Sequence, residues 1–169
     1  VIGGEDLTED GRLEILGLCS RAYQVNFEPI LCTFPGATHV LARQHGILVS
    51  HALWVTRWLQ YGTLPLLRTA YVEAVATEEA YQGRGFATAV MRKLATEICD
   101  FDLGALSPAQ YGLYSSLGWE VWRGPLFIRT ADGLLPTPNE KVMILRLPKT
   151  PALDLDTPLS AEWREGELW

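Results

Sequence analysis

A pair of glycines in the middle of the chain constrains its fold more than any other feature. The segment Gln82–Ala87 (QGRGFA) lies between an apolar, strand-like run and an amphipathic helical pattern. Glycines at such a turn let backbone N–H groups point into one concavity, and the following helix adds the positive end of its dipole. Arg84 adds a formal positive charge. The segment therefore predicts either a phosphate or pyrophosphate site or a strand-to-helix turn without a ligand.

Three phosphate ligands compete for this segment. A nucleoside triphosphate loop needs Lys followed by Ser or Thr after the second glycine, but Phe86 and Ala87 stand there. A dinucleotide loop needs a third glycine, where this chain has Thr88. The pyrophosphate of coenzyme A is the third candidate, and a turn without a ligand stays open beside it.

The spacing of apolar residues predicts an α/β (α+β) fold. Thr8 and Asp10 are possible caps of an early helix. The predicted elements are a helix at Asp10–Tyr23, strands at Thr38–Arg43, Ile47–Gln60 and Leu66–Ala76, a helix at Phe86–Ile98, a strand at Phe101–Leu106, a helix from Pro108 to Leu117, and strands at Trp119–Arg129 and Val142–Leu147. This order predicts a mixed, mostly antiparallel sheet flanked by helices, with one parallel crossover.

The length and apolar content suit a single domain over residues 1–169. The chain has 169 residues, of which 48% are hydrophobic, so it can build a core without disulfides or metals. Residues 148–169 change in character, with three prolines and several acidic residues. We expect them to form an irregular C-terminal extension packed on the domain.

Charge and hydropathy exclude several classes of partner. The formal net charge is −6 and no basic patch is visible, which disfavours nucleic acid and suits a cationic substrate. No apolar run is long enough to cross a bilayer or resembles a signal peptide. These observations predict a cytoplasmic protein that does not bind a membrane, although the chain starts at Val1 rather than Met.

Cysteine and histidine give no metal or disulfide signal. The three cysteines are an odd number without a C-x-x-C spacing, so we expect buried, reduced thiols. His39, His45 and His51 recur every six residues, but His45 lies in a predicted turn and no carboxylate partner is evident. We therefore predict no metal site.

The ordered set of motifs around the glycines resembles the GNAT superfamily of acetyltransferases. Gln82, Gly85 and Ala87 match the loop pattern of that superfamily. The run Tyr71–Ala76 is similar to its fourth strand, and Leu113-Tyr114 followed by Gly118-Trp119 is similar to its second signature. The resemblance implies a GNAT fold that uses acetyl-coenzyme A as co-substrate.

Three further motifs resemble the aminoglycoside 2'-N-acetyltransferases within that superfamily. They are Tyr-Val-Glu at 71–73, Leu-Gly-Ala-Leu-Ser at 103–107 and the ending Glu-Trp-Arg-Glu-Gly-Glu-Leu-Trp at 162–169. That family carries several acidic residues after the first helix, whereas Glu28 is the one acidic residue at positions 26–32 of this chain. The resemblance implies an aminoglycoside antibiotic as the amine substrate and a role in antibiotic resistance.

Acetyl transfer to an amine needs a base, an acid and a polarised thioester carbonyl. Glu73 is a carboxylate in an apolar strand-like run, so it lies either on a solvent face or in a functional cleft. In a cleft it is the expected base, acting through water. Tyr114 is the expected donor of a proton to the departing thiolate, with half-buried packing as its alternative. The resemblance implies cofactor contacts from Val75, Ala76, Thr77, Gln82, Gly83, Arg84, Gly85, Phe86 and Ala87, and substrate contacts from Glu28, Glu73, Glu140 and Trp169.

The sequence thus predicts an aminoglycoside N-acetyltransferase, with the 2' amino group as the expected position. No cysteine stands where an acetyl carrier would be expected, which favours direct attack in a ternary complex. One alternative is a GNAT enzyme for another amine, such as a polyamine, an amino sugar or a protein N-terminus. The other is a non-catalytic domain that senses acetyl-CoA. The oligomeric state stays open between a monomer and a homodimer.

Overall fold

The computed structural model describes residues 1–169, which divide into two compact units. Unit 1 contains residues 1–55 and 72–97, and unit 2 contains residues 56–71 and 98–169. Two long strands, β3 (Ile47–Tyr61) and β4 (Leu66–Thr77), begin in one unit and end in the other. The single domain predicted over the whole chain stays a prediction.

The strands of unit 1 form a small antiparallel arrangement. Strand β1 (Ile2–Gly3) pairs with β2 (Thr38–Gln44), and β2 pairs with β3. The β2–β3 hairpin turns at His45 and Gly46, whose φ angles are 50° and 82°. Two consecutive positive φ angles are typical of a tight hairpin turn that matches the twist of its strands. The hairpin predicted from the sequence is confirmed.

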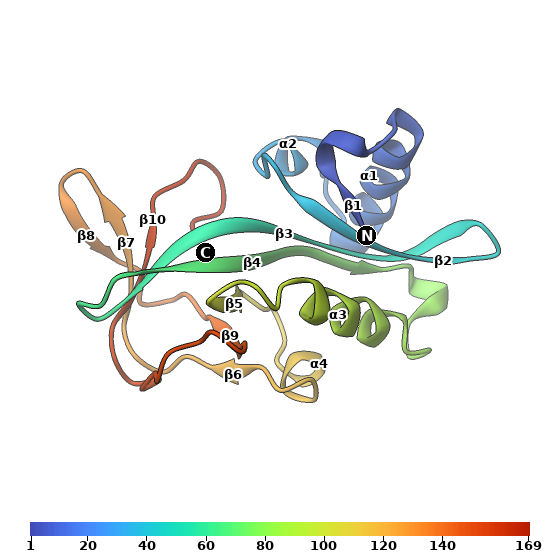
Figure 1. The fold of residues 1–169 in the computed structure, drawn as a ribbon. Coiled ribbons are helices and arrows are strands. Elements are labelled where there is room, and N and C mark those ends of the chain that lie inside the picture. The colour runs from blue at the N-terminus through green and yellow to red at the C-terminus, as the bar shows by residue number, and fades with distance from the viewer. The chain divides into compact units, whose positions relative to one another are not determined.

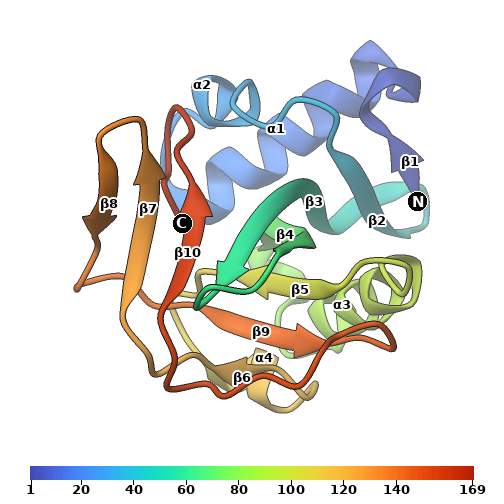
Figure 2. The same ribbon diagram turned by 60° about the vertical axis from the view of Figure 1, so that its left-hand side comes forward.

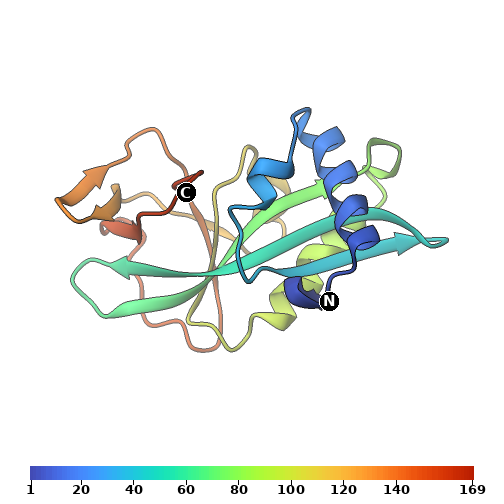
Figure 3. The same cartoon turned by 90° about the horizontal axis from the view of Figure 1, so that it is seen from above.

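Helices cover both faces of the unit 1 strands. Helices α1 (Glu9–Tyr23) and α2 (Glu28–Leu31) lie on one face and α3 (Phe86–Glu97) on the other (Figures 1 and 3). Short 3-10 turns, η1 (Gly4–Asp6) and η2 (Glu79–Tyr81), precede α1 and α3. Each long helix buries an apolar stripe, which consists of Ile15, Leu18 and Cys19 in α1 and of Val90, Met91 and Leu94 in α3.

Unit 2 holds a mixed sheet with the strand order β6-β9-β5-β4-β3-β10-β7-β8, part of which is seen in Figure 2. Strand β5 runs parallel to β4, and β10 runs parallel to β7, whereas β5–β9, β6–β9, β7–β8 and β3–β10 are antiparallel. The strands are β5 (Leu103–Leu106), β6 (Glu120–Val121), β7 (Leu126–Thr130), β8 (Gly133–Pro136), β9 (Met143–Arg146) and β10 (Leu159–Glu162). The predicted mixed sheet with a parallel crossover is confirmed.

Two predicted elements of unit 2 differ in the structure. The helix expected from Pro108 to Leu117 is only one turn, α4 (Gly112–Ser115). The strand expected over Trp119–Arg129 is broken into β6 and β7 around Gly124. The Gly124 N–H donates to Leu155 O, and a Cβ on Gly124 would lie 2.1 Å from a backbone oxygen of Thr157. This close packing against the chain at 155–157 interrupts the strand.

The C-terminal extension contains a strand that periodicity did not reveal. Strand β10 is inserted between β3 and β7, and its first three residues are buried. Four residues are too short a run to show alternation, so its pairing partners, rather than its sequence, make it a strand.

All three cysteines are free, but only Cys19 is buried, so the expectation of three buried thiols is wrong for Cys32 and Cys99. No helix combines the length and apolar character needed to cross a bilayer.

Candidate active site

Strand β4 is distorted next to the predicted base. Ala74 has a φ of 52°, in the left-handed region that non-glycine residues rarely adopt, and it lies inside a strand. Glu73 precedes it and is half-buried, between the buried residues Val72 and Ala74. Such left-handed residues are costly and cluster at functional sites. The distortion reorients the peptides of β4 that follow Glu73.

Side chains hold four successive carbonyl groups beyond this distortion. They are His51 Nδ1 to Ala74 O at 2.9 Å, Tyr23 Oη to Val75 O at 3.0 Å, Ser50 Oγ to Ala76 O at 3.1 Å, and Gln82 Nε2 to Thr77 O at 3.4 Å. Each of these carbonyl groups accepts a hydrogen bond from a side chain of another segment. The end of β4 is therefore held in place by groups from α1, β3 and the glycine segment.

Two buried histidines, His39 and His51, form a chain of hydrogen bonds that ends at Ala74 O. Because a carbonyl only accepts, His51 Nδ1 carries the proton that it donates to Ala74 O. Its Nε2 then accepts from His39 Nδ1 at 3.0 Å. Burial, followed by the neighbouring His39, lowers the pKa of His51 to about 3, so His51 is neutral at physiological pH. His45 lies apart in the hairpin turn, and no group of three His, Cys, Asp or Glu residues could hold a metal ion.

The glycine segment has the backbone that its sequence predicts. Gly83 and Gly85 have φ angles of 69° and 84°, and a Cβ on either would meet nothing within 4 Å. The first turn of α3 contains no acidic residue, so the positive end of its dipole is not neutralised there. Arg84 stacks over Tyr81 at 4.9 Å and is exposed. Open space, the N–H groups at the start of a helix and a cation together fit a pyrophosphate.

Three residues that hold β4 were missed by sequence reasoning. Tyr23 ends α1, and Ser50 and His51 lie on β3, so none of them is near β4 in the sequence. The one available signal was polar residues in an otherwise apolar strand, since Ser50 and His51 are both 0% exposed.

Tyr114 lies in unit 2, on the single turn of α4. It is half-buried and meets Trp119 edge-on, with ring centroids 6.2 Å apart. Its carbonyl accepts from the N–H groups of Leu117 and Trp119 at 2.9 and 3.1 Å. Burial raises the pKa of the Tyr114 hydroxyl, which keeps it protonated over the neutral range.

The predicted substrate residues fall in different units. Glu28 is exposed at the start of α2 in unit 1, and its N–H donates to Asn26 Oδ1. In unit 2, Glu140 and Trp169 both contact Thr137. The Glu140 N–H donates to Thr137 O at 3.2 Å, and the Trp169 indole donates to Thr137 Oγ1 at 2.8 Å. Trp169 is only 4% exposed, so its indole packs in unit 2.

A buried arginine fixes the C-terminal extension within unit 2. Arg57 is 1% exposed and donates to Glu162 O and Leu168 O, both at 2.8 Å. Its guanidinium also lies 4.8 Å from the ring centre of Tyr71. Because an unpaired buried cation is costly, these carbonyl groups and Arg57 hold one another in place.

A family model described as an acetyltransferase (GNAT) domain matches residues 5–122. This chain belongs to the GNAT acetyltransferase family. The match covers the distorted strand, the glycine segment and α4, and it confirms the predicted family, fold and acetyltransferase class of this GNAT protein.

Relatives of this GNAT protein include aminoglycoside N-acetyltransferases. An aminoglycoside 2'-N-acetyltransferase of Mycolicibacterium fortuitum is 37% identical over 141 residues, which are 79% of this chain and 72% of that protein. Among solved structures, Eis1 from Mycobacterium abscessus aligns with a TM-score of 0.61 and 18% identity over 70% of this chain. The chain spans 30% of the length of Eis1. An aminoglycoside 6'-N-acetyltransferase complexed with coenzyme A aligns with a TM-score of 0.61 and 14% identity, over 90% of this chain and 98% of that one.

Proposed function

We propose that this GNAT protein transfers an acetyl group from acetyl-CoA to an amino group of an aminoglycoside, with the 2' amino group as the first candidate. The observation that carries the proposal is the relative from Mycolicibacterium fortuitum, because 37% identity extends over 72% of that aminoglycoside 2'-N-acetyltransferase. The likeness to the 6' enzyme supports the fold alone, since its identity is 14%.

The cofactor part of the proposal rests on the end of β4 and the glycine segment. Their residues are Val75, Ala76 and Thr77, followed by Gln82–Ala87. Coenzyme A would bring a pyrophosphate, which suits the first turn of α3 and Arg84, and a thioester that is the acetyl donor. The side chains that hold the carbonyl groups of Ala74 to Thr77 would keep the β4 peptides rigid. Rigid N–H groups near Val75 and Ala76 could then polarise the thioester carbonyl.

Direct transfer requires two proton movements. The amine attacks the thioester carbonyl, a C–N bond forms, and the C–S bond breaks. Glu73 would accept the proton that the ammonium loses, through water, and Tyr114 would donate a proton to the departing thiolate. A protonated Tyr114 suits this role, because burial raises its pKa.

The substrate part of the proposal rests on charge. Aminoglycosides carry several ammonium groups, and a protein with a net charge of −6 attracts cations. Glu28, Glu73 and Glu140 are the carboxylates assigned to them, and Trp169 supports the chain beside Glu140 through Thr137.

A thiol-release assay on a panel of aminoglycosides tests the function. We expect turnover on aminoglycosides with a free 2' amino group, and NMR of the product should place the acetyl group on that nitrogen. The Glu73→Gln variant should keep acetyl-CoA binding and lose most of the turnover, by roughly a hundredfold. Turnover of a polyamine but of no aminoglycoside would indicate the alternative amine substrate. Acetyl-CoA binding without turnover of any amine would indicate a sensor.

A further inference from the structure

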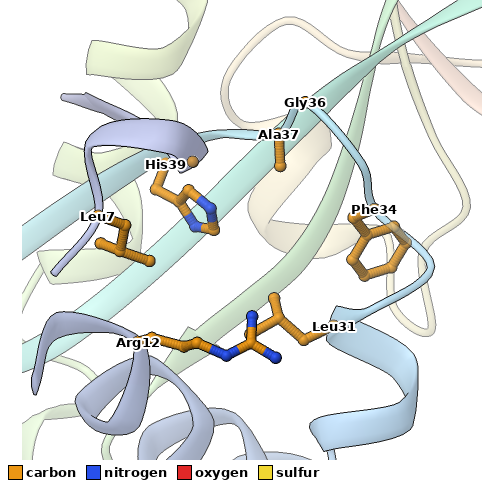
Figure 4. A pocket seen from close by; sticks show the side chains of 8 residues that line it. Leu7, Arg12, Leu31, Phe34, Gly36, Ala37 and His39 are labelled. Atoms are coloured by element: carbon orange, nitrogen blue, oxygen red, sulfur yellow. The ribbon is translucent and has the colours of Figure 1, made fainter. Parts of the chain in front are cut away.

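Unit 1 contains a cavity that no residue of β4 or of the glycine segment lines. Its volume is about 180 Å³, and it lies between η1, α1, α2 and β2 (Figure 4). Leu7, Leu31, Phe34 and Ala37 supply the apolar part of its walls. A cavity of about this size holds a molecule as large as benzene. Two side chains, Arg12 and His39, give it a polar side.

Arg12 has no acidic partner in the structure. It makes no ion pair, and the one hydrogen bond of its side chain runs from Nη2 to Cys32 Sγ at 3.5 Å, which is a weak acceptor. The side chain extends into the cavity towards Leu31 (Figure 4). A guanidinium with unused donors beside an apolar wall is suited to a carboxylate, which it can bind with two parallel hydrogen bonds.

His39 offers the opposite kind of group, a hydrogen-bond acceptor. Its Nδ1 carries a proton, because it donates to the unprotonated Nε2 of His51. Burial, followed by the charge of Arg12, lowers the pKa of His39, so its second nitrogen stays unprotonated. Gly4 also lines the cavity, and a Cβ added to Gly4 would lie 3.8 Å from His39 Nε2. A ligand beside it must donate a hydrogen bond.

We propose that this cavity binds a small hydroxy acid. The carboxylate pairs with Arg12, the hydroxyl donates to His39 Nε2, and the hydrocarbon body packs against Leu31 and Phe34. A purely apolar ligand would leave both polar groups without partners, at a cost in affinity. A simple carboxylate would satisfy Arg12 only. The two hydrogen-bonding groups thus define the ligand class.

Hydroxybenzoates test this proposal, because their three isomers keep charge and apolar area constant and change only the distance between the two polar groups. Each isomer is titrated by calorimetry into the full chain without acetyl-CoA, beside benzoate, which lacks the hydroxyl, and phenol, which lacks the carboxylate. We expect one isomer to bind about tenfold more tightly than either control. Equal affinity for that isomer and benzoate, or binding of none of the five, would overturn the proposal.

Two further readouts assign the binding to the cavity. The Arg12→Met variant should bind the preferred isomer about tenfold more weakly, whereas Arg92→Met, which removes an exposed charge from α3, should bind it normally. In the wild-type protein, ¹⁵N NMR should show a shift of the His39 Nε2 resonance on binding. Unchanged His39 resonances would overturn the proposal even if Arg12→Met does not fold. None of these measurements depends on acetyl transfer, so their failure would leave the proposed function standing.

Discussion

At the scale of single residues, burial sets the protonation of two groups in the proposed site, Tyr114 and His51. Burial raises the pKa of Tyr114 and lowers that of His51, so the first stays a donor and the second stays neutral. The structure reports these environments, whereas the sequence shows only the residue types.

Replacing Tyr114 with Phe tests its part in the reaction. We expect kcat to fall by about tenfold with little change in KM, because the proposed proton donation takes place in the transition state and a thiolate needs only mild help to leave. Tyr111→Phe is the matched control, one residue before α4 and also half-buried. Equal kcat values for both variants and the wild type would make Tyr114 a packing residue.

His51 makes the protein less stable in acid. Its folded pKa of about 3 lies below its ordinary value of 6.5, so the unfolded state binds more protons between these values. The contribution of His51 to the free energy of unfolding is therefore complete above about pH 6.5 and is lost as the pH falls towards 3. Between pH 7 and pH 5 this loss is about 2 kcal/mol. Urea unfolding at the two pH values measures this loss.

The variant His51→Gln supplies the comparison for that measurement. A glutamine does not titrate, and its amide can donate to a carbonyl, so the variant should be less stable at pH 7 but should lose less stability on acidification. An equal acid-induced loss in both proteins would mean that other groups, such as His39, dominate.

At the scale of elements, the glycine segment is where local sequence and conformation agree. Gly83 and Gly85 both need positive φ angles, and the open space above them leaves room for a ligand rather than for a side chain. The turn that the glycines predict therefore forms as expected, and its part in cofactor binding stays a proposal.

Replacing Gly85 with Asp should weaken acetyl-CoA binding by about tenfold or more, because it places a negative charge where pyrophosphate is proposed to bind. Any side chain is also strained at a φ of 84°. Gly85→Asn is the matched control, since asparagine tolerates this region and carries no charge. Calorimetry measures the affinities, and similar affinities of the two variants would show that charge at this position is unimportant.

At the scale of the whole molecule, the C-terminal extension is part of the sheet and not an attachment to it. Arg57 fixes Glu162 and Leu168, and Trp169 is bound to Thr137 beside the loop of Glu140. The extension thus supports the position of a proposed substrate carboxylate within unit 2.

Deleting residues 166–169 should raise the KM for the amine strongly and leave acetyl-CoA affinity nearly unchanged. The deletion removes the Trp169 contact and one acceptor of Arg57, so thermal unfolding must show that the variant is folded. Thr137→Ala, which removes only the partner of the indole, is the milder comparison. The KM for the amine should also rise with salt in the wild type. Normal amine kinetics in the folded deletion variant would exclude a substrate role of the extension.

The sequence by itself determined the elements whose signals are local. The Thr8 cap of α1, the turn at His45 and Gly46, the long strands and the glycine segment each depend on residues close together in the chain, and each was predicted. Asp10, the other expected cap, lies inside the helix. So was the family, because its motifs occur in order along the sequence. The break at Gly124 and strand β10 depend on segments about 30 to 100 residues away, as the contacts of Gly124 with Leu155 and of β10 with Gln60 show.

Only the tertiary structure decided which side chains surround the functional ones. The left-handed Ala74, the histidine pair behind it and the cavity of Arg12 and His39 come from segments that are distant in sequence. Hydrophobic periodicity can indicate that such residues are buried, but not what they meet there. Burial and hydrogen-bond partners set the protonation of a side chain and the direction of its hydrogen bonds. Both exist only once the chain has folded.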